Sequence, residues 1–197
     1  MPTSVTADHS ETSAEDDRAL ARVFAAYTVS ATIWLLFATA IGLLLAFKFG
    51  APDFWAAKYL TFGRLRPIHT NATFYGWASL GLVGLAYYVA ARSCRTRLYS
   101  TTLAWVGLWL FNIAAIAGTV ALDLGYSAGD LEYREWLWPI RVIFLAALLV
   151  TAWNLVWTVA RRQSVDIYLS NWYTMGGVLW TCIIAVVAIL PWYQHGL

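Results

Sequence analysis

Five long apolar runs limit what this chain can fold into. Each run is close to the ~20 residues that a helix needs to cross a bilayer. The chain is 60% hydrophobic and 12% charged, whereas ordinary soluble domains carry about 25% charged residues. We therefore predict an all-α, polytopic membrane bundle at 18–197 with five transmembrane helices. The predicted spans lie near residues 24–47, 67–91, 101–124, 137–160 and 170–190.

The N-terminal segment differs in composition from the rest of the chain. Residues 1–17 are polar and acidic and lack the basic region with which a signal peptide begins. Ser13 with Asp16 resembles a capping box, which predicts an early start of the first helix and a disordered tail before it. The net charge of +2 is too small to indicate a nucleic-acid partner.

The orientation follows from the basic residues between the spans. With a cytoplasmic N-terminus, the inner segments carry seven of the 13 Lys and Arg residues and the outer segments carry six. The positive-inside rule then favours this orientation slightly, and more so if Arg64 and Arg66 bind a ligand. It places His69, the loop at 125–136 and the C-terminus at the outer face.

The sequence GRLRPIHTNATFYGW, residues 63–77, carries the most chemistry. Pro67 suits the first position of a helix, which would put His69 in the first turn with Arg64 and Arg66 one turn away. An imidazole can ligate haem iron, and guanidinium groups can bind haem propionates. Arg141 is a third candidate for the propionates. Alternatively, the histidine bonds a carbonyl and the arginines only anchor the helix at the lipid headgroups.

Small residues follow His69 on the same predicted helix face. Ala72, Thr73 and Gly76 stand three, four and seven positions later. Such a face leaves room for a flat macrocycle, although it would serve helix packing equally well.

The loop from Asp123 to Trp136 is acidic, with four carboxylates against one basic residue, Arg134. It is either a solvated loop or a site for a hard cation such as calcium, which carboxylates and carbonyls bind. A divalent ion there would bridge loop carboxylates to haem propionates. Glu132 and Glu135 are the candidate ligands.

Residues 63–77 resemble the start of the second transmembrane helix in the catalytic subunit I of cbb3-type cytochrome c oxidases, the C family of haem–copper oxidases. GYSAGDLEYREWLWPI, residues 125–140, is similar to the acidic outer loop of that family. YLSNWY, residues 168–173, is similar to the opening of its fifth helix. The resemblance covers most of this chain but only the first part of the twelve-helix subunit.

This resemblance implies that His69 ligates the low-spin haem b, that arginines bind the propionates, and that calcium lies near them. The second axial ligand, the high-spin haem and the copper-binding histidines would come from later helices, so no catalytic residue is expected here. His195 is a less favoured second ligand. The ending PWYQHGL departs from the family's copper motif, since Gln194 replaces a glycine and no asparagine follows His195.

The resemblance also implies a function for the whole protein. The chain would be an N-terminal fragment, or one half, of the catalytic subunit of a respiratory oxidase in the bacterial inner (plasma) membrane. Electrons would pass from c-type cytochrome subunits through haem b to a haem–copper centre that reduces oxygen to water with proton translocation. The remainder of subunit I and lipids would be further partners, and this chain alone would be inactive. The alternatives are a fragment of a nitric oxide reductase large subunit and a non-catalytic haem-carrying membrane protein.

Overall fold

The computed structural model describes residues 3–129 and 132–189, with side chains from residue 14 onward. This part of the chain is helical and contains no strand, which confirms the all-α prediction. The elements are α1 (Thr3–Gly50), α2 (Phe62–Asn71), the π-helix η1 (Ala72–Ala78), α3 (Ser79–Ser93), α4 (Thr101–Leu124), α5 (Trp138–Ala160) and α6 (Leu169–Ile189).

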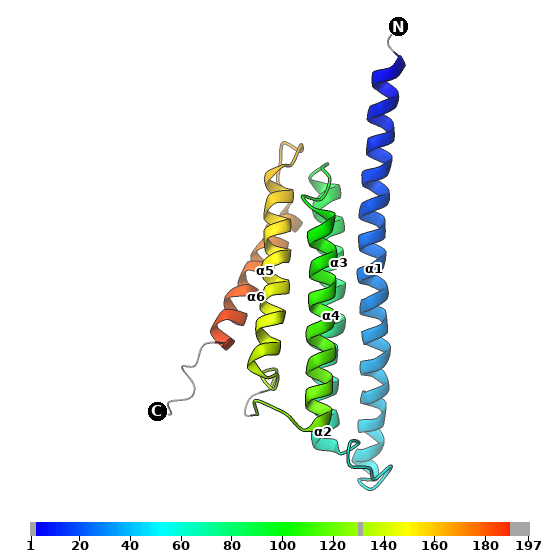
Figure 1. Ribbon diagram of the computed structural model, residues 1–197, viewed down its shortest axis with the longest axis vertical. Helices are drawn as coiled ribbons and strands as arrows, with labels where there is room; N and C mark the ends of the chain where they lie inside the picture. Colours follow the sequence, from blue (N-terminus) through cyan, green and yellow to red (C-terminus); the bar gives the residue numbers. More distant parts are fainter. Residues whose placement is uncertain (1–2, 130–131, 190–197) are drawn as a thin grey trace.

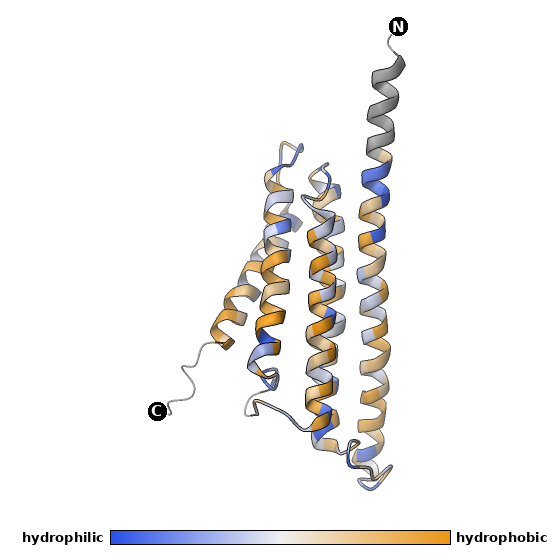
Figure 2. Cartoon of the chain, in the orientation of Figure 1, coloured by the Kyte–Doolittle hydropathy of each residue, from blue (hydrophilic) through white to orange (hydrophobic). Residues whose placement is uncertain are grey.

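Within the described residues, five helices are long and apolar enough to cross a membrane, as predicted. The second crossing combines α2, η1 and α3 into one helix from Phe62 to Ser93. The helices run side by side, with α6 tilted against the others (Figure 1). Apolar residues dominate the middle of the bundle, and strongly polar residues gather towards its two ends (Figure 2). This distribution matches a bilayer-spanning bundle.

The first helix is longer than the sequence predicts. It begins at Thr3, where a disordered tail was expected, and it extends beyond the other helices at the N-terminal end (Figure 1). Extending a helix that already exists gains one hydrogen bond for each residue that it fixes, whereas starting a new one is costly. An ion pair of 3.0 Å between Asp17 and Arg92 ties α1 to the end of α3.

Glycine notches set the contact between α1 and the second crossing. At three levels, a large side chain of one helix lies against a glycine of the other. A Cβ built on any of these glycines would come within 2.6–2.7 Å of that side chain, so only glycine allows the approach. Small residues let the backbones of membrane helices pack closely in this way. The three pairs are His69 against Gly42, Trp34 against Gly76, and Tyr27 against Gly84.

The last helix is held more loosely than the one before it. Half of the most apolar window of α5 is buried, against 6% of the corresponding window of α6. At the start of α6, the buried Asn171 accepts a hydrogen bond from Ser93 at 3.0 Å and contacts the Cys94 sulfur at 3.3 Å. The N-terminal part of α6 is therefore fastened to the end of α3.

Candidate haem-ligand site at the start of the second crossing

The helix that carries the motif begins earlier than predicted. It starts at Phe62, so Pro67 lies inside α2 instead of opening it. Arg64, Arg66 and His69 consequently share one helix. Residues two positions apart point about 200° apart around a helix axis, so the two arginines are directed to different neighbours.

His69 is partly buried, and α1 fixes its ring. Its Nδ1 lies 2.8 Å from the carbonyl oxygen of Ala38. Because a carbonyl only accepts hydrogen bonds, Nδ1 carries the proton and Nε2 of the neutral ring carries the free electron pair. The ring also lies in the notch at Gly42, where a Cβ would come within 2.7 Å of Cε1. Metal-ligating histidines are commonly oriented by such a bond from the other ring nitrogen, so the residues present fit a haem ligand.

The small-residue face below His69 serves helix packing. Gly76 lies against the Trp34 indole of α1, and Ala72 is 2% exposed. The expected room for a macrocycle along this face is therefore occupied by α1. The π-helical geometry of η1 also changes the spacing of this face from that of an α-helix. The Thr73 hydroxyl donates a hydrogen bond of 2.8 Å to the His69 carbonyl, one turn earlier in the same crossing.

Arg64 reaches the end of α4. Its Nη1 donates to the carbonyl of Asp123, close to the left-handed C-cap residue Gly125 (φ 91°). The guanidinium also lies 5.5 Å from the centre of the Tyr59 ring. A cation at a helix C-terminus is stabilised by the exposed carbonyls there, so Arg64 has a structural role that the sequence did not predict.

Arg66 and the acidic loop are brought together. Arg66 Nη2 lies 3.0 Å from Glu132 Oε1, and the two side chains are 57% and 48% exposed. One turn further along the crossing, Asn71 Nδ2 lies 3.1 Å from Glu135 Oε2. Both acids predicted as cation ligands therefore contact the helix that carries His69.

A buried tryptophan anchors this loop, which the acidic composition did not indicate. Trp136 is 3% exposed, and its indole nitrogen lies directly over Gly118 of α4. Its ring packs against Tyr75 with centroids 4.4 Å apart.

The sequence reasoning missed Gly42 and Asn71 as site residues. Two features of the sequence could have indicated them: Gly42 is a glycine inside an apolar span, and Asn71 is an amide two positions after His69.

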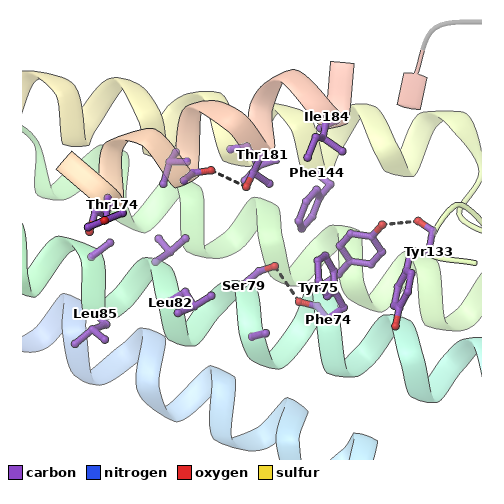
Figure 3. Close-up of a pocket in the computed structure, with 18 of the residues that line it drawn as sticks. Phe74, Tyr75, Ser79, Leu82, Leu85, Tyr133, Phe144, Thr174, Thr181 and Ile184 are labelled. Carbon is purple, nitrogen blue, oxygen red and sulfur yellow. Dashed lines mark hydrogen bonds between the residues drawn. The ribbon is translucent and has the colours of Figure 1, made fainter. Parts of the chain in front are cut away.

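Arg141 occupies a different part of the bundle. Its Nη1 donates to the Ala188 carbonyl of α6 at 2.7 Å. It lines a cavity of about 630 Å³ between η1, α3, α5 and α6 that His69, Arg64 and Arg66 do not line. Tyr75 and Tyr133 lie at one end of this mainly apolar cavity and Thr174 at the other (Figure 3).

No group of three or more His, Cys, Asp or Glu side chains gathers in a metal-binding arrangement within the described residues. Glu132 and Glu135 remain a pair on one loop. His195 and the C-terminal sequence around it lie outside the described residues.

Comparison with known proteins agrees with the motif. The family described as "Cytochrome C and Quinol oxidase polypeptide I" matches residues 22–196. The cbb3-type cytochrome c oxidase subunit CcoN1 of Stutzerimonas stutzeri is 29% identical over 167 residues, which are 84% of this chain and 35% of that protein. A cytochrome c oxidase subunit 1 homolog of Agrobacterium tumefaciens (strain T37) is 30% identical over 169 residues, 82% of this chain and 30% of that protein.

The chain thus spans about a third of the length of these relatives. The matched residues include the histidine motif, the acidic loop, most of the first span and the other four spans. The resemblance to a haem–copper oxidase subunit I drawn from residues 63–77 is confirmed. The chain belongs to the cytochrome c and quinol oxidase polypeptide I family and corresponds to the N-terminal portion of such a subunit.

Proposed function

We propose that this chain provides one axial ligand, His69, to the low-spin haem b of a respiratory terminal oxidase. The observation that carries the proposal is the bond of 2.8 Å between His69 Nδ1 and the Ala38 carbonyl, which leaves Nε2 as the basic nitrogen. A bound haem would supply one-electron transfer. The protein's part is to fix the tautomer and the orientation of the imidazole.

The arginines are proposed to hold the negative charge of the propionates. Arg66 is the better placed, because it shares a face with His69 three residues away and its partner Glu132 is half exposed. An exposed ion pair contributes little stability, so the guanidinium can exchange a carboxylate partner at small cost. Arg64 of α2 would contribute from its position against the end of α4, and Arg141 is the least favoured of the three.

A hard cation is proposed beside the same helix. Glu135 lies against Asn71, whose buried Oδ1 has no hydrogen-bond partner among the described residues. An amide oxygen beside a carboxylate matches the ligand preference of calcium. With Glu132 on the same loop, a divalent ion would offset the repulsion between loop acids and propionates.

Membership of this family supports a role in a larger enzyme. In the assembled oxidase, c-type cytochrome subunits would reduce the haem at His69, and ligands outside this chain would hold the high-spin haem and copper. We place the protein in the bacterial plasma membrane with a cytoplasmic N-terminus and His69 near the outer face. A nitric oxide reductase subunit is the alternative within the wider superfamily. Oxygen and nitric oxide consumption by the whole complex separates the two.

The decisive experiment is His69→Ala in the full-length subunit. We expect the low-spin haem spectrum to disappear while the polypeptide remains in the membrane. Thr70→Ala is the matched control, since the Thr70 hydroxyl bonds only within its own helix and the spectrum should persist. A full low-spin signal in His69→Ala would contradict the assignment.

The cation is tested separately by metal analysis of the purified complex. We expect bound calcium in the native protein and its loss in the double variant Glu132→Gln with Glu135→Gln. If the complex contains no calcium and chelators do not change its low-spin haem, the cation proposal is wrong. The haem proposal would not be affected by that result.

A further inference from the structure

Asn112 of α4 is bonded to α1 through its amide oxygen. That oxygen lies 2.9 Å from Ser30 Oγ and 3.0 Å from Trp34 Nε1, and both of these groups belong to α1. The amide nitrogen donates to the Leu108 carbonyl of its own helix at 2.9 Å. An indole N–H only donates, so the oxygen must face Trp34 and the orientation of the amide is fixed. Asn112 therefore holds the Trp34 indole in one direction.

The held indole fills one of two glycine notches that interlock α1 with the second crossing. Trp34 lies in the notch at Gly76, where a Cβ would come within 2.7 Å of the ring. In the opposite direction, His69 of the second crossing lies in the notch at Gly42 of α1. The two notches are about two helical turns apart. Because one side chain projects from each helix into the other, the pair opposes sliding of α1 along the second crossing.

The register between these helices sets the carbonyl that the imidazole meets. Ala38, whose carbonyl oxygen lies 2.8 Å from His69 Nδ1, stands four residues after Trp34 and four before Gly42. A hydrogen bond keeps its strength only within a narrow range of length and angle, so a small displacement of α1 would weaken this one. Packing and interhelical hydrogen bonds are the forces that hold such a register in a bilayer.

We propose that Asn112 and Trp34 are positioning residues for His69, a role that rests on its proposed function as a haem ligand. The first two crossings set the register, and α4 then locks it by keeping the indole in the notch at Gly76. Both residues act through the Ala38 carbonyl, which orients the ring. Without the Asn112 amide, the indole loses its acceptor and is free to leave the notch.

The test is Asn112→Leu in the full-length subunit, because leucine has a similar size and offers no acceptor. Groups that orient a metal ligand typically change metal affinity by about 10–100-fold. Asn112 acts one contact further away, so we expect the affinity for the low-spin haem to fall by about tenfold. The EPR signal of the oxidised low-spin haem, which depends on the orientation of the axial imidazole, should shift as well. Unchanged haem affinity and an unchanged signal would overturn the proposal.

Asn171→Leu is the matched control. Asn171 bonds to Ser93 and Cys94 at the far end of the second crossing from His69. The same substitution there should reduce the stability of the bundle and leave the haem affinity and the EPR signal as in the native protein. If both leucine variants shift the haem signal equally, the effect is general loosening of the bundle and the proposal is wrong.

Trp34→Phe tests the route from Asn112 to the ring. It removes the indole N–H and keeps an aromatic ring at the notch. If Asn112 acts through this bond, the double variant with Asn112→Leu should lose less haem affinity than the two single variants combined. Independent, additive losses would overturn the route through Trp34.

A measurement without haem separates this inference from haem ligation. The chain has three histidines, so nitrogen NMR of labelled imidazoles identifies His69 by comparison with His69→Ala. Nitrogen chemical shifts distinguish a proton on Nδ1 from one on Nε2. We expect the Nδ1 form in the native chain and a mixture of both forms in Asn112→Leu. A pure Nδ1 form in both would overturn the positioning role, even where His69→Ala has lost the low-spin haem. A mixture in the variant would support the role, even if another residue ligated the haem.

Discussion

Two polar sites at opposite ends of the bundle are held in different ways. At the end opposite His69, Asn154 is fully buried and accepts from the Ser100 amide at 3.0 Å while donating to the Ser100 carbonyl at 2.9 Å. At the His69 end, Arg66 and Glu132 form an ion pair whose two side chains are about half exposed. Asn154 is held by main-chain bonds, whereas Arg66 presents a charge that can change partners.

This difference separates residues that hold the fold from residues available to a ligand. A buried side chain that satisfies main-chain groups cannot be removed without leaving those groups unpaired. An exposed ion pair can be opened at little cost. The three substitutions below test the distinction in order of expected effect on stability.

Removing the Asn154 side chain should have the largest effect. Asn154→Ala leaves the part-buried Ser100 amide without its partner and removes one of the two hydrogen bonds to the Ser100 carbonyl, which costs about 3 kcal/mol of unfolding free energy. The measurement is reversible unfolding of the chain in mixed micelles. Gln163→Ala is the control, because the Gln163 side chain is exposed and its main-chain bond to the Cys94 carbonyl is retained. Equal stability of the two variants would mean that Asn154 does not hold the Ser100 main chain as described.

Filling the notch beside His69 should have an intermediate effect. Gly42→Ala places a methyl group 2.7 Å from His69 Cε1, and overpacking of this kind costs about 1–3 kcal/mol. The imidazole must also move, so the low-spin haem signal of the full-length subunit should fall. Gly177→Ala introduces the same change where nothing lies within 4 Å, and we expect it to be neutral or stabilising. If both alanine variants behave alike, the notch does not position the ring.

Breaking the exposed ion pair should have the smallest effect. Glu132→Gln is expected to change the unfolding free energy by less than about 0.5 kcal/mol, because both partners are about half exposed. The stability of the native protein should accordingly change little between low and high salt. A loss above about 1 kcal/mol would show that this pair helps to hold the loop and is not freely exchangeable.

The sequence predicted the spans well because bilayer thickness sets their length. The third predicted span, 101–124, coincides with α4, and the fourth differs from α5 by one residue at its start. The first two helices were less well predicted. Polar residues before Ala14 continue α1, and α2 starts five residues before Pro67, where hydropathy gives no signal.

The sequence predicted which residue types form the site and which of them lie near one another, but not the contacts that position His69. Charge and topology placed Glu132 near Arg66, and the structure joins them. The contact that orients His69 was not predictable, since a main-chain carbonyl such as that of Ala38 has no signature in the sequence. The space expected at Gly76 was also misjudged, because only the register between two helices shows that Trp34 fills it.

The glycine notches have a consequence for the order of biogenesis. The groups that orient the His69 ring, Ala38 and Gly42, belong to the helix made immediately before it. The first two crossings form an antiparallel hairpin that is complete at Ser93, before α4 leaves the ribosome. We expect this hairpin to fix the imidazole at an early stage of synthesis. The histidine would then be oriented before any later helix, or any cofactor, reaches it.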